Sequence, residues 1–205
     1  MSTSAPAHLH RRGCDGDGGP GAGDRSPRKP TDFQQCAGAD TLVVVVQVSP
    51  ARLDWLLALA GSDAVFSSRF GIAVEPGWSG FPEAVPAALS AARQRAEDPW
   101  GTHLFFDDDG SLVGFGGFKG EPVDGVVELG YAVSPSRRRQ GIATAVVEIL
   151  LERARDAGVA TVIAHTLAGP NPSTGVLDKT GFRHTATSDD DEVGAVWRWE
   201  RPTAV

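Results

Sequence analysis

The segment VELGYAVSPSRRRQGIATAVVEILLERA, residues 127–154, constrains the fold of this 205-residue chain more than any other. Its beginning has the apolar, β-branched character of a strand. Its end carries apolar residues at helical spacing, among them Val146, Ile149 and Leu150. A strand, a short loop and a helix in direct succession predict a mixed α/β domain, with one parallel strand pair joined across this helix.

The loop before that helix has the chemistry of an anion site. A helix N-terminus leaves four backbone amides unpaired and carries the positive end of the dipole. Gly141 and Ala143 are small enough to let a pyrophosphate reach those amides, and Arg137, Arg138 and Arg139 add charge. No lysine of a nucleotide-hydrolysing phosphate loop follows. A solvated basic loop and a nucleic-acid contact are the alternatives.

Charge and cysteine usage narrow the function classes. The formal net charge of −7 argues against a general nucleic-acid-binding module. Cys14 and Cys36 show neither metal-ligand spacing nor a disulfide framework, so we expect no metal site. No apolar run reaches membrane-spanning length, and the N-terminus lacks the apolar stretch of a signal peptide. We expect a cytoplasmic protein that does not bind membranes.

The chain divides into a tail and one domain. Residues 1–40 are rich in Gly, Pro, Asp and Arg and predict a disordered tail, whereas residues 41–205 predict the folded domain. We expect strands at 42–48, 102–107, 112–118, 125–133, 159–167, 182–187 and 195–202, and helices at 49–61, 83–99, 141–157 and 171–181. Ser49 and Pro50 are expected to begin the first helix, and residues 62–82 to form an irregular connection, with a short helix inside it as the alternative.

The pattern Arg138-x-x-Gly141-x-Ala143 resembles the acetyl-CoA signature of the GNAT superfamily of N-acetyltransferases, [Gln/Arg]-x-x-Gly-x-[Gly/Ala]. The later segment HTLAGPNPSTGVLDKTGF resembles the next strand and helix of that superfamily. The resemblance covers residues 41–201 in element order and is closest over 126–182, where the chain looks most like the branch that includes the ribosomal-protein N-terminal acetyltransferases. It implies a GNAT-like α/β fold with a mixed, mostly antiparallel sheet flanked by helices and an acetyl-CoA cosubstrate. Homodimers are common in this superfamily, and the sequence leaves the oligomeric state open.

The resemblance also implies a set of cofactor-binding residues. Backbone amides would bind the CoA pyrophosphate, and they belong to Arg138, Arg139, Gln140, Gly141, Ile142, Ala143 and Thr144. The main chain of Ala132 and Val133 would pair with pantetheine like an added strand, and the Val133 amide would point at the thioester oxygen. Asn171 would lie beside the pantetheine arm; its alternative role is to cap the following helix.

Glu128 is the candidate general base. An alkylammonium has a pKa near ~10.4, so the enzyme must remove a proton before the amine can attack. Glu128 lies mid-strand among apolar residues and resembles the acidic base of many family members, and partial burial would raise its pKa. A structural carboxylate paired with an arginine such as Arg198 is the alternative. His165, at a strand end, is interpreted as structural, with catalysis as its alternative.

The thiolate leaving group has no tyrosine acid at the expected place. The matching slot of the family's helix holds Leu177, so Ser173, bound water or unassisted departure would serve. Trp78 and Phe81 are candidate walls of the acceptor pocket. The acidic stretch 189–192 is interpreted as a solvated loop, with attraction of a cationic amine as its alternative.

The predicted reaction is therefore acetyl transfer from acetyl-CoA to a primary amine by direct attack in a ternary complex. The chain has no well-placed cysteine for a covalent acetyl-enzyme. Protein N-termini, lysines, small amines, amino acids and antibiotics are all compatible acceptors. The alternative function is a non-catalytic CoA-binding regulatory or sensor module.

Overall fold

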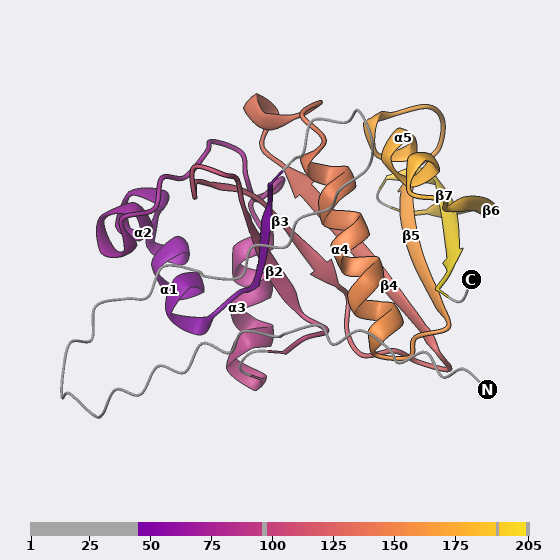
Figure 1. Ribbon diagram of the computed structural model, residues 1–205, viewed down its shortest axis with the longest axis horizontal. Helices are drawn as coiled ribbons and strands as arrows, with labels where there is room; N and C mark the ends of the chain where they lie inside the picture. The colour runs from indigo at the N-terminus through magenta and orange to yellow at the C-terminus, as the bar shows by residue number, and fades with distance from the viewer. Residues whose placement is uncertain (1–44, 96–97, 192, 204–205) are drawn as a thin grey trace, which may run out of the picture.

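The computed structural model describes residues 45–95, 98–191 and 193–203 (Figure 1). The predicted tail, residues 1–40, lies outside these ranges, as do Leu42 to Val44. The elements are β1 (Gln47–Pro50), α1 (Leu53–Gly61), α2 (Asp63–Phe70), α3 (Ala84–Gln94), β2 (Thr102–Phe106), β3 (Leu112–Phe118), β4 (Val126–Val133), a short 3-10 helix (Pro135–Arg137), α4 (Ile142–Asp156), β5 (Thr161–Leu167), α5 (Pro172–Lys179), β6 (Arg183–Asp190) and β7 (Gly194–Pro202).

The strands form one seven-stranded sheet in the order β1-β2-β3-β4-β5-β7-β6. Only β4 and β5 are parallel, and every other pair is antiparallel. The helix α4 connects the two parallel strands, as a crossover must. The predicted mixed α/β fold, with its mostly antiparallel sheet and single parallel step, is thus confirmed.

Helices cover the two faces of the sheet unequally (Figure 1). The helices α4 and α5 contribute to a core with side chains from β1 to β5 and β7, of which Val127, Leu129 and Val162 are fully or almost fully buried. The helices α1, α2 and α3 enclose a second core against β2 and β3, with Leu104, Phe106 and Leu112 at its centre. These three helices therefore cover the half of the sheet whose strands come first in the sequence.

The strand β3 is packed so tightly that it needs glycine. The ring of Phe105 on β2 lies against Gly114 and Gly116 of β3, and a Cβ atom added at Gly116 would stand 2.3 Å from the carbonyl oxygen of Gly130 on β4. No real Cβ approaches backbone this closely. The sequence LVGFGGF thus lets the central strands β2, β3 and β4 come together under an aromatic ring.

One prediction about the first half of the chain is wrong. Ser49 and Pro50 do not begin a helix: they extend β1, where they pair with Leu104 and His103 of β2, and α1 begins at Leu53. Proline is tolerated there because β1 is an edge strand.

The connection at 62–82 contains one short helix, α2, which is the alternative that the sequence left open. The Ser62 hydroxyl accepts a hydrogen bond from the Val65 amide at the start of α2, and Gly71, with φ +67°, ends the helix. The acidic stretch is also not wholly a loop, because Asp189 and Asp190 belong to β6. None of the helices in the described ranges is long and apolar enough to cross a bilayer.

Candidate active site

The site lies where β4 and β5 separate. Their parallel pairing covers only Val126 to Glu128 against Thr161 to Ile163. After Ile163, β5 is paired with β7, while β4 continues for five residues along β3. The edge of β4 that faces β5 is therefore left without a strand partner among the described residues, and a gap opens in the sheet.

The hydrogen-bond register of β4 determines which peptide groups face this gap. The Lys119 amide donates to the Glu128 carbonyl, and the Ser134 amide donates to the Val113 carbonyl. In an antiparallel ladder these two bonds direct the peptide groups of the even-numbered residues of β4 toward β3. The groups of Leu129, Tyr131 and Val133 consequently face the gap.

This register refines the predicted main-chain contacts. Val133 is placed with its amide toward the gap, as expected for a residue that would bind a thioester oxygen. The peptide groups of Ala132 instead point to Phe115 of β3. Tyr131 is therefore the second residue whose main-chain N–H and C=O groups face the gap. The prediction for the Ala132 main chain is corrected accordingly. Residue type gives no signal for this choice, because it depends on the register alone.

The opening of α4 lies directly after β4 and has the properties of an anion site. Gly141 is the N-cap residue, with φ +84°, and no side chain caps the helix. Arg139 also has a positive φ, +61°, which is uncommon for a residue with a side chain. No intramolecular acceptor is recorded for the amides of residues 139–144 within the described ranges. These amides belong to six of the seven residues predicted to bind pyrophosphate.

The arginines of the loop support its shape instead of forming one charged cluster. Arg137 forms ion pairs with Glu75 at 3.0 Å and with the buried Asp107 at 3.3 Å. Arg138 donates from Nε to the Val133 carbonyl at 3.1 Å, and Gln140 donates to the Ser136 carbonyl at 3.2 Å. The loop is thus tied to the end of β4, to the β2–β3 turn and to the segment after α2.

Arg137→Ala is expected to lower stability in a pH-dependent way. Hydrogen bonds from Ser136 and from Arg137 hold the pKa of Glu75 below its ordinary value of 4.5. Such a carboxylate stabilises the fold above its unfolded pKa, and the contribution is lost as pH falls through the lower, folded pKa. The variant should therefore have a smaller free energy of unfolding than wild type at pH 7, and the difference should shrink toward pH 3. Urea unfolding across that range measures it.

The matched control is Arg93→Ala, on the exposed side of α3. It removes the same charge, and Arg93 has no ion pair with any described residue, so it should change the free energy of unfolding little at any pH. An equal loss in both variants, or a loss that does not depend on pH, would contradict a specific role for the Arg137 pairs.

Glu128 is held by two cationic or hydrogen-bonding partners that the sequence did not identify. Its Oε1 accepts hydrogen bonds from Lys119 Nζ and from His165 Nδ1, the latter at 3.0 Å. Burial raises the pKa of Glu128, but the two hydrogen bonds outweigh it and keep that pKa below 4.5. The expected rise in pKa is therefore wrong, and so is the alternative pairing, because Arg198 binds Glu200 instead. Lys119 could have been found only from the register of β3 and β4.

The start of α5 is organised by Asn171. Its side-chain oxygen accepts from the Ser173 and Thr174 amides, and its side-chain nitrogen donates to the Leu167 and Gly169 carbonyls. These four bonds use the whole capacity of the amide group, so a contact with pantetheine would have to replace one of them. The alternative role as a helix cap is what the structure shows.

Ser173 lies at the gap in contact with β4. Its carbonyl accepts a hydrogen bond from the Tyr131 hydroxyl at 3.4 Å, and burial raises the pKa of Tyr131 to about 12. Leu177 is fully buried in the core, so this position of α5 contributes packing and no proton donor. The chain's single tyrosine thus approaches α5 from β4 rather than from α5 itself.

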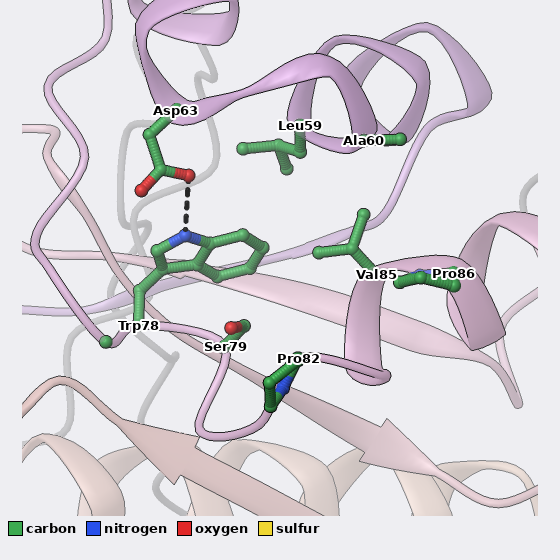
Figure 2. A pocket seen from close by; sticks show the side chains of 9 residues that line it. Leu59, Ala60, Asp63, Trp78, Ser79, Pro82, Val85 and Pro86 are labelled. Carbon is green, nitrogen blue, oxygen red and sulfur yellow. Dashed lines mark hydrogen bonds between the residues drawn. The ribbon is translucent and has the colours of Figure 1, made fainter.

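The two aromatic residues predicted for the acceptor pocket differ in exposure. Trp78 is 3% exposed, and its Nε1 donates to Asp63 at 3.1 Å (Figure 2). It lines a cavity of about 300 Å³ between α1, α3 and the 77–82 segment, to which no residue of β4 contributes. Trp78 is therefore a core residue that lines this cavity, and its role as a wall of the acceptor pocket stays a prediction.

Phe81 remains close to β4. It is 52% exposed and stands edge-on to Phe115, which pairs with Ala132. A Cβ atom at Gly80 would lie 2.6 Å from the Ala132 side chain, so the segment rests directly on that strand. Phe81 thus lies beside the face of β4 that carries Glu128, Gly130 and Ala132.

Comparison with known proteins agrees with this arrangement. The sequence profile of the Acetyltransferase (GNAT) family matches residues 73–182. No curated protein sequence matches the chain. Similar solved structures include the ribosomal-protein-S18-alanine N-acetyltransferase of Escherichia coli, with 17% identity, a TM-score of 0.56 and coverage of 78% of this chain and 95% of that one.

Two further structures are similar in the same way. The ribosomal-protein-S5-alanine acetyltransferase of Vibrio fischeri has 13% identity and a TM-score of 0.57, covering 77% of this chain and 93% of that one. A putative acetyltransferase of Salmonella typhimurium, solved with its cofactor acetyl-CoA, has 15% identity and a TM-score of 0.54, covering 78% and 94%. These likenesses show the fold, and the profile covers more than half of the sequence: the chain belongs to the GNAT family of acetyltransferases and is an acyltransferase.

Proposed function

We propose that the protein transfers the acetyl group of acetyl-CoA to a primary amine by direct attack in a ternary complex. The observation that carries this proposal is the gap between β4 and β5, which ends at the uncapped N-terminus of α4. A free strand edge next to a cluster of unpaired amides suits a ligand with a peptide-like arm and a pyrophosphate. Acetyl-CoA is such a ligand, and when bound it supplies an activated thioester.

Each part of the site has a distinct task. The amides of residues 139–144 bind the phosphates, and the outward peptide groups of Tyr131 and the Val133 carbonyl pair with the pantetheine amides. The Val133 amide is the donor that stabilises negative charge developing on the carbonyl oxygen. Ser173, at the start of α5, is the candidate proton donor to the departing thiolate. Cysteine is absent from the described ranges, which favours direct attack over an acetyl-enzyme.

Glu128 is the carboxylate on which proton removal from the amine depends. It lies on the face of β4 opposite α4, the same face on which the segment with Phe81 packs at Ala132, four residues further along the strand. Two of the similar structures are named for alanine residues of ribosomal proteins, so a protein N-terminus that begins with alanine is one acceptor class to test. Small amines such as spermidine form the second class.

Glu128→Gln is expected to lower kcat/KM by about 100-fold while leaving the acetyl-CoA dissociation constant unchanged. The amide keeps the shape of the side chain but loses its negative charge. Release of free CoA with alanine-initiated peptides and spermidine measures turnover, and calorimetry measures binding.

The matched control is Glu148→Gln, on the exposed side of α4. It should leave both quantities unchanged. A CoA-binding sensor would give a different result: acetyl-CoA would bind, and neither wild type nor variant would release CoA with any amine.

A further inference from the structure

Glu128 and His165 form a hydrogen-bonded pair across the two strands that border the gap. Glu128 is in register with Ile163 of β5, two residues before His165. Val162 and Ala164 are buried in the core under α4, so Ile163 and His165 point to the other face, the one that carries Glu128. The His165 side chain is 31% exposed and therefore open to an acceptor.

The hydrogen bond determines which ring nitrogen of His165 carries the proton. An ionised carboxylate can only accept, and the pKa of Glu128 is held low by its partners. The Nδ1 atom must then be the donor in its 3.0 Å contact with Glu128 Oε1. In a neutral imidazole this leaves a lone pair on Nε2. No partner of Nε2 is recorded in the described part of the chain.

The same geometry makes Glu128 a weak proton acceptor. Its Oε1 already receives hydrogen bonds from Lys119 and His165, and both of them favour the ionised carboxylate. A base whose charged form is stabilised in this way holds a proton poorly at neutral pH. Imidazole is the side-chain group whose chemistry suits proton transfer near neutral pH, and one lies directly beside this carboxylate.

We infer that His165 Nε2 takes the proton from the ammonium group of the acceptor, and that Glu128 positions the ring through its hydrogen bond to Nδ1. This inference rests on the proposed function and refines the role of Glu128 within it. The acceptor loses two protons in the reaction: the first passes to His165, which produces the free amine. After the N–C bond forms and the C–S bond breaks, the second ends on the CoA thiol, and His165 returns the first to water.

Three charged side chains surround His165 on the neighbouring strands. On the β4 side, His165 faces the carboxylate of Glu128. Lys119 lies beyond Glu128, at the end of β3. On the β7 side, Arg198 is the register partner of His165, and its guanidinium is paired with Glu200. Lys119 and Arg198 are thus each paired with a carboxylate.

The first experiment reads the tautomer without any acceptor. Nitrogen-15 spectra of the histidine rings in the full-length protein should show His165 protonated on Nδ1 at neutral pH, and Glu128→Gln should shift this distribution. A wild-type ring protonated on Nε2 would overturn the inference, because the lone pair would then face Glu128.

The second experiment measures kinetics with alanine-initiated peptides and spermidine. His165→Gln should lower kcat about 100-fold at pH 7 with an unchanged acetyl-CoA dissociation constant. Its residual rate should rise about tenfold per pH unit from 7 to 9, because the amine must then lose its proton unaided. A merely structural role would not produce that slope. The double variant with Glu128→Gln should be little worse than either single variant, since the two act as a unit.

The outcomes separate this inference from the proposed function. If His165→Gln keeps kcat within about threefold of wild type and Glu128→Gln does not, Glu128 acts directly and the inference is wrong. If neither variant loses activity, the proposed function of this face is wrong as well. His184→Gln is the matched control, since His184 stacks on Trp197, and it should leave kcat unchanged.

Discussion

Gly141→Glu is expected to abolish acetyl-CoA binding, with a loss of affinity greater than about 100-fold. Gly141 caps α4 with φ +84°, and no side chain shields the amides around it. A glutamate there would bring a carboxylate to the point where the phosphates must bind, and it would repel them at the positive end of the helix dipole. Calorimetry with acetyl-CoA measures the change.

The opposite end of the same helix provides the control. Gly158 has φ +76°, and a Cβ atom added there would meet nothing within 4 Å, so Gly158→Glu imposes the same backbone strain far from the phosphate site. Both variants should lose roughly 1 kcal/mol of stability from that strain. Only Gly141→Glu should lose affinity.

The arginine loop gives a second comparison for the same measurement. Arg137→Ala should retain most of its acetyl-CoA affinity, because Arg137 is engaged with Glu75 and Asp107. An equal loss of affinity in Arg137→Ala and Gly141→Glu would mean that positive charge, and not the backbone amides, determines binding.

Gly116→Val is expected to prevent stable folding. The added Cβ would lie 2.3 Å from the Gly130 carbonyl oxygen and 2.7 Å from the Tyr131 Cα, both of which are backbone atoms of β4. Relief would require the two central strands to separate, at a cost above the roughly 1–3 kcal/mol of ordinary overpacking. Because domains of this kind have about 5–15 kcal/mol in total, we expect a large fall in soluble yield and thermal midpoint.

Gly175→Ala is the control for the effect of removing a glycine. Gly175 lies in α5, and a Cβ atom there meets nothing within 4 Å. Alanine in a helix should stabilise by about 0.5–1 kcal/mol relative to glycine. Comparable destabilisation by both substitutions would show that strand contact at Gly116 is not the cause.

Much of the second half of the domain was predictable because its signals are local. The amphipathic spacing from Ile142 to Asp156, the Gly141 opening and the alternation along β4 are each read from neighbouring residues. The first half of the domain was harder to predict. The strand β1 extends through Ser49 and Pro50 because β2 pairs with them, and this tertiary contact overrides their preference to begin a helix.

The candidate site was likewise predictable only where its signals are local. The positions of Gly141 and Glu128 were predictable, but their surroundings come from residues far away in the chain. His165 reaches Glu128 across 37 residues and Arg137 reaches Glu75 across 62, so neither pair has a sequence signal. The direction of the pKa shift of Glu128 was wrong for that reason: burial was foreseen from the apolar neighbours, and the partners were not.

The short pairing of β4 with β5 has a mechanical consequence. Three register pairs are the hydrogen-bonded connection between a four-stranded and a three-stranded section of the sheet, with α4 packed across the join. A ligand that lies along the free edge of β4 would act as an eighth strand and bridge the two sections. The two sections would then unfold as one cooperative unit, and substrate occupancy would be part of what makes the sheet a single structure.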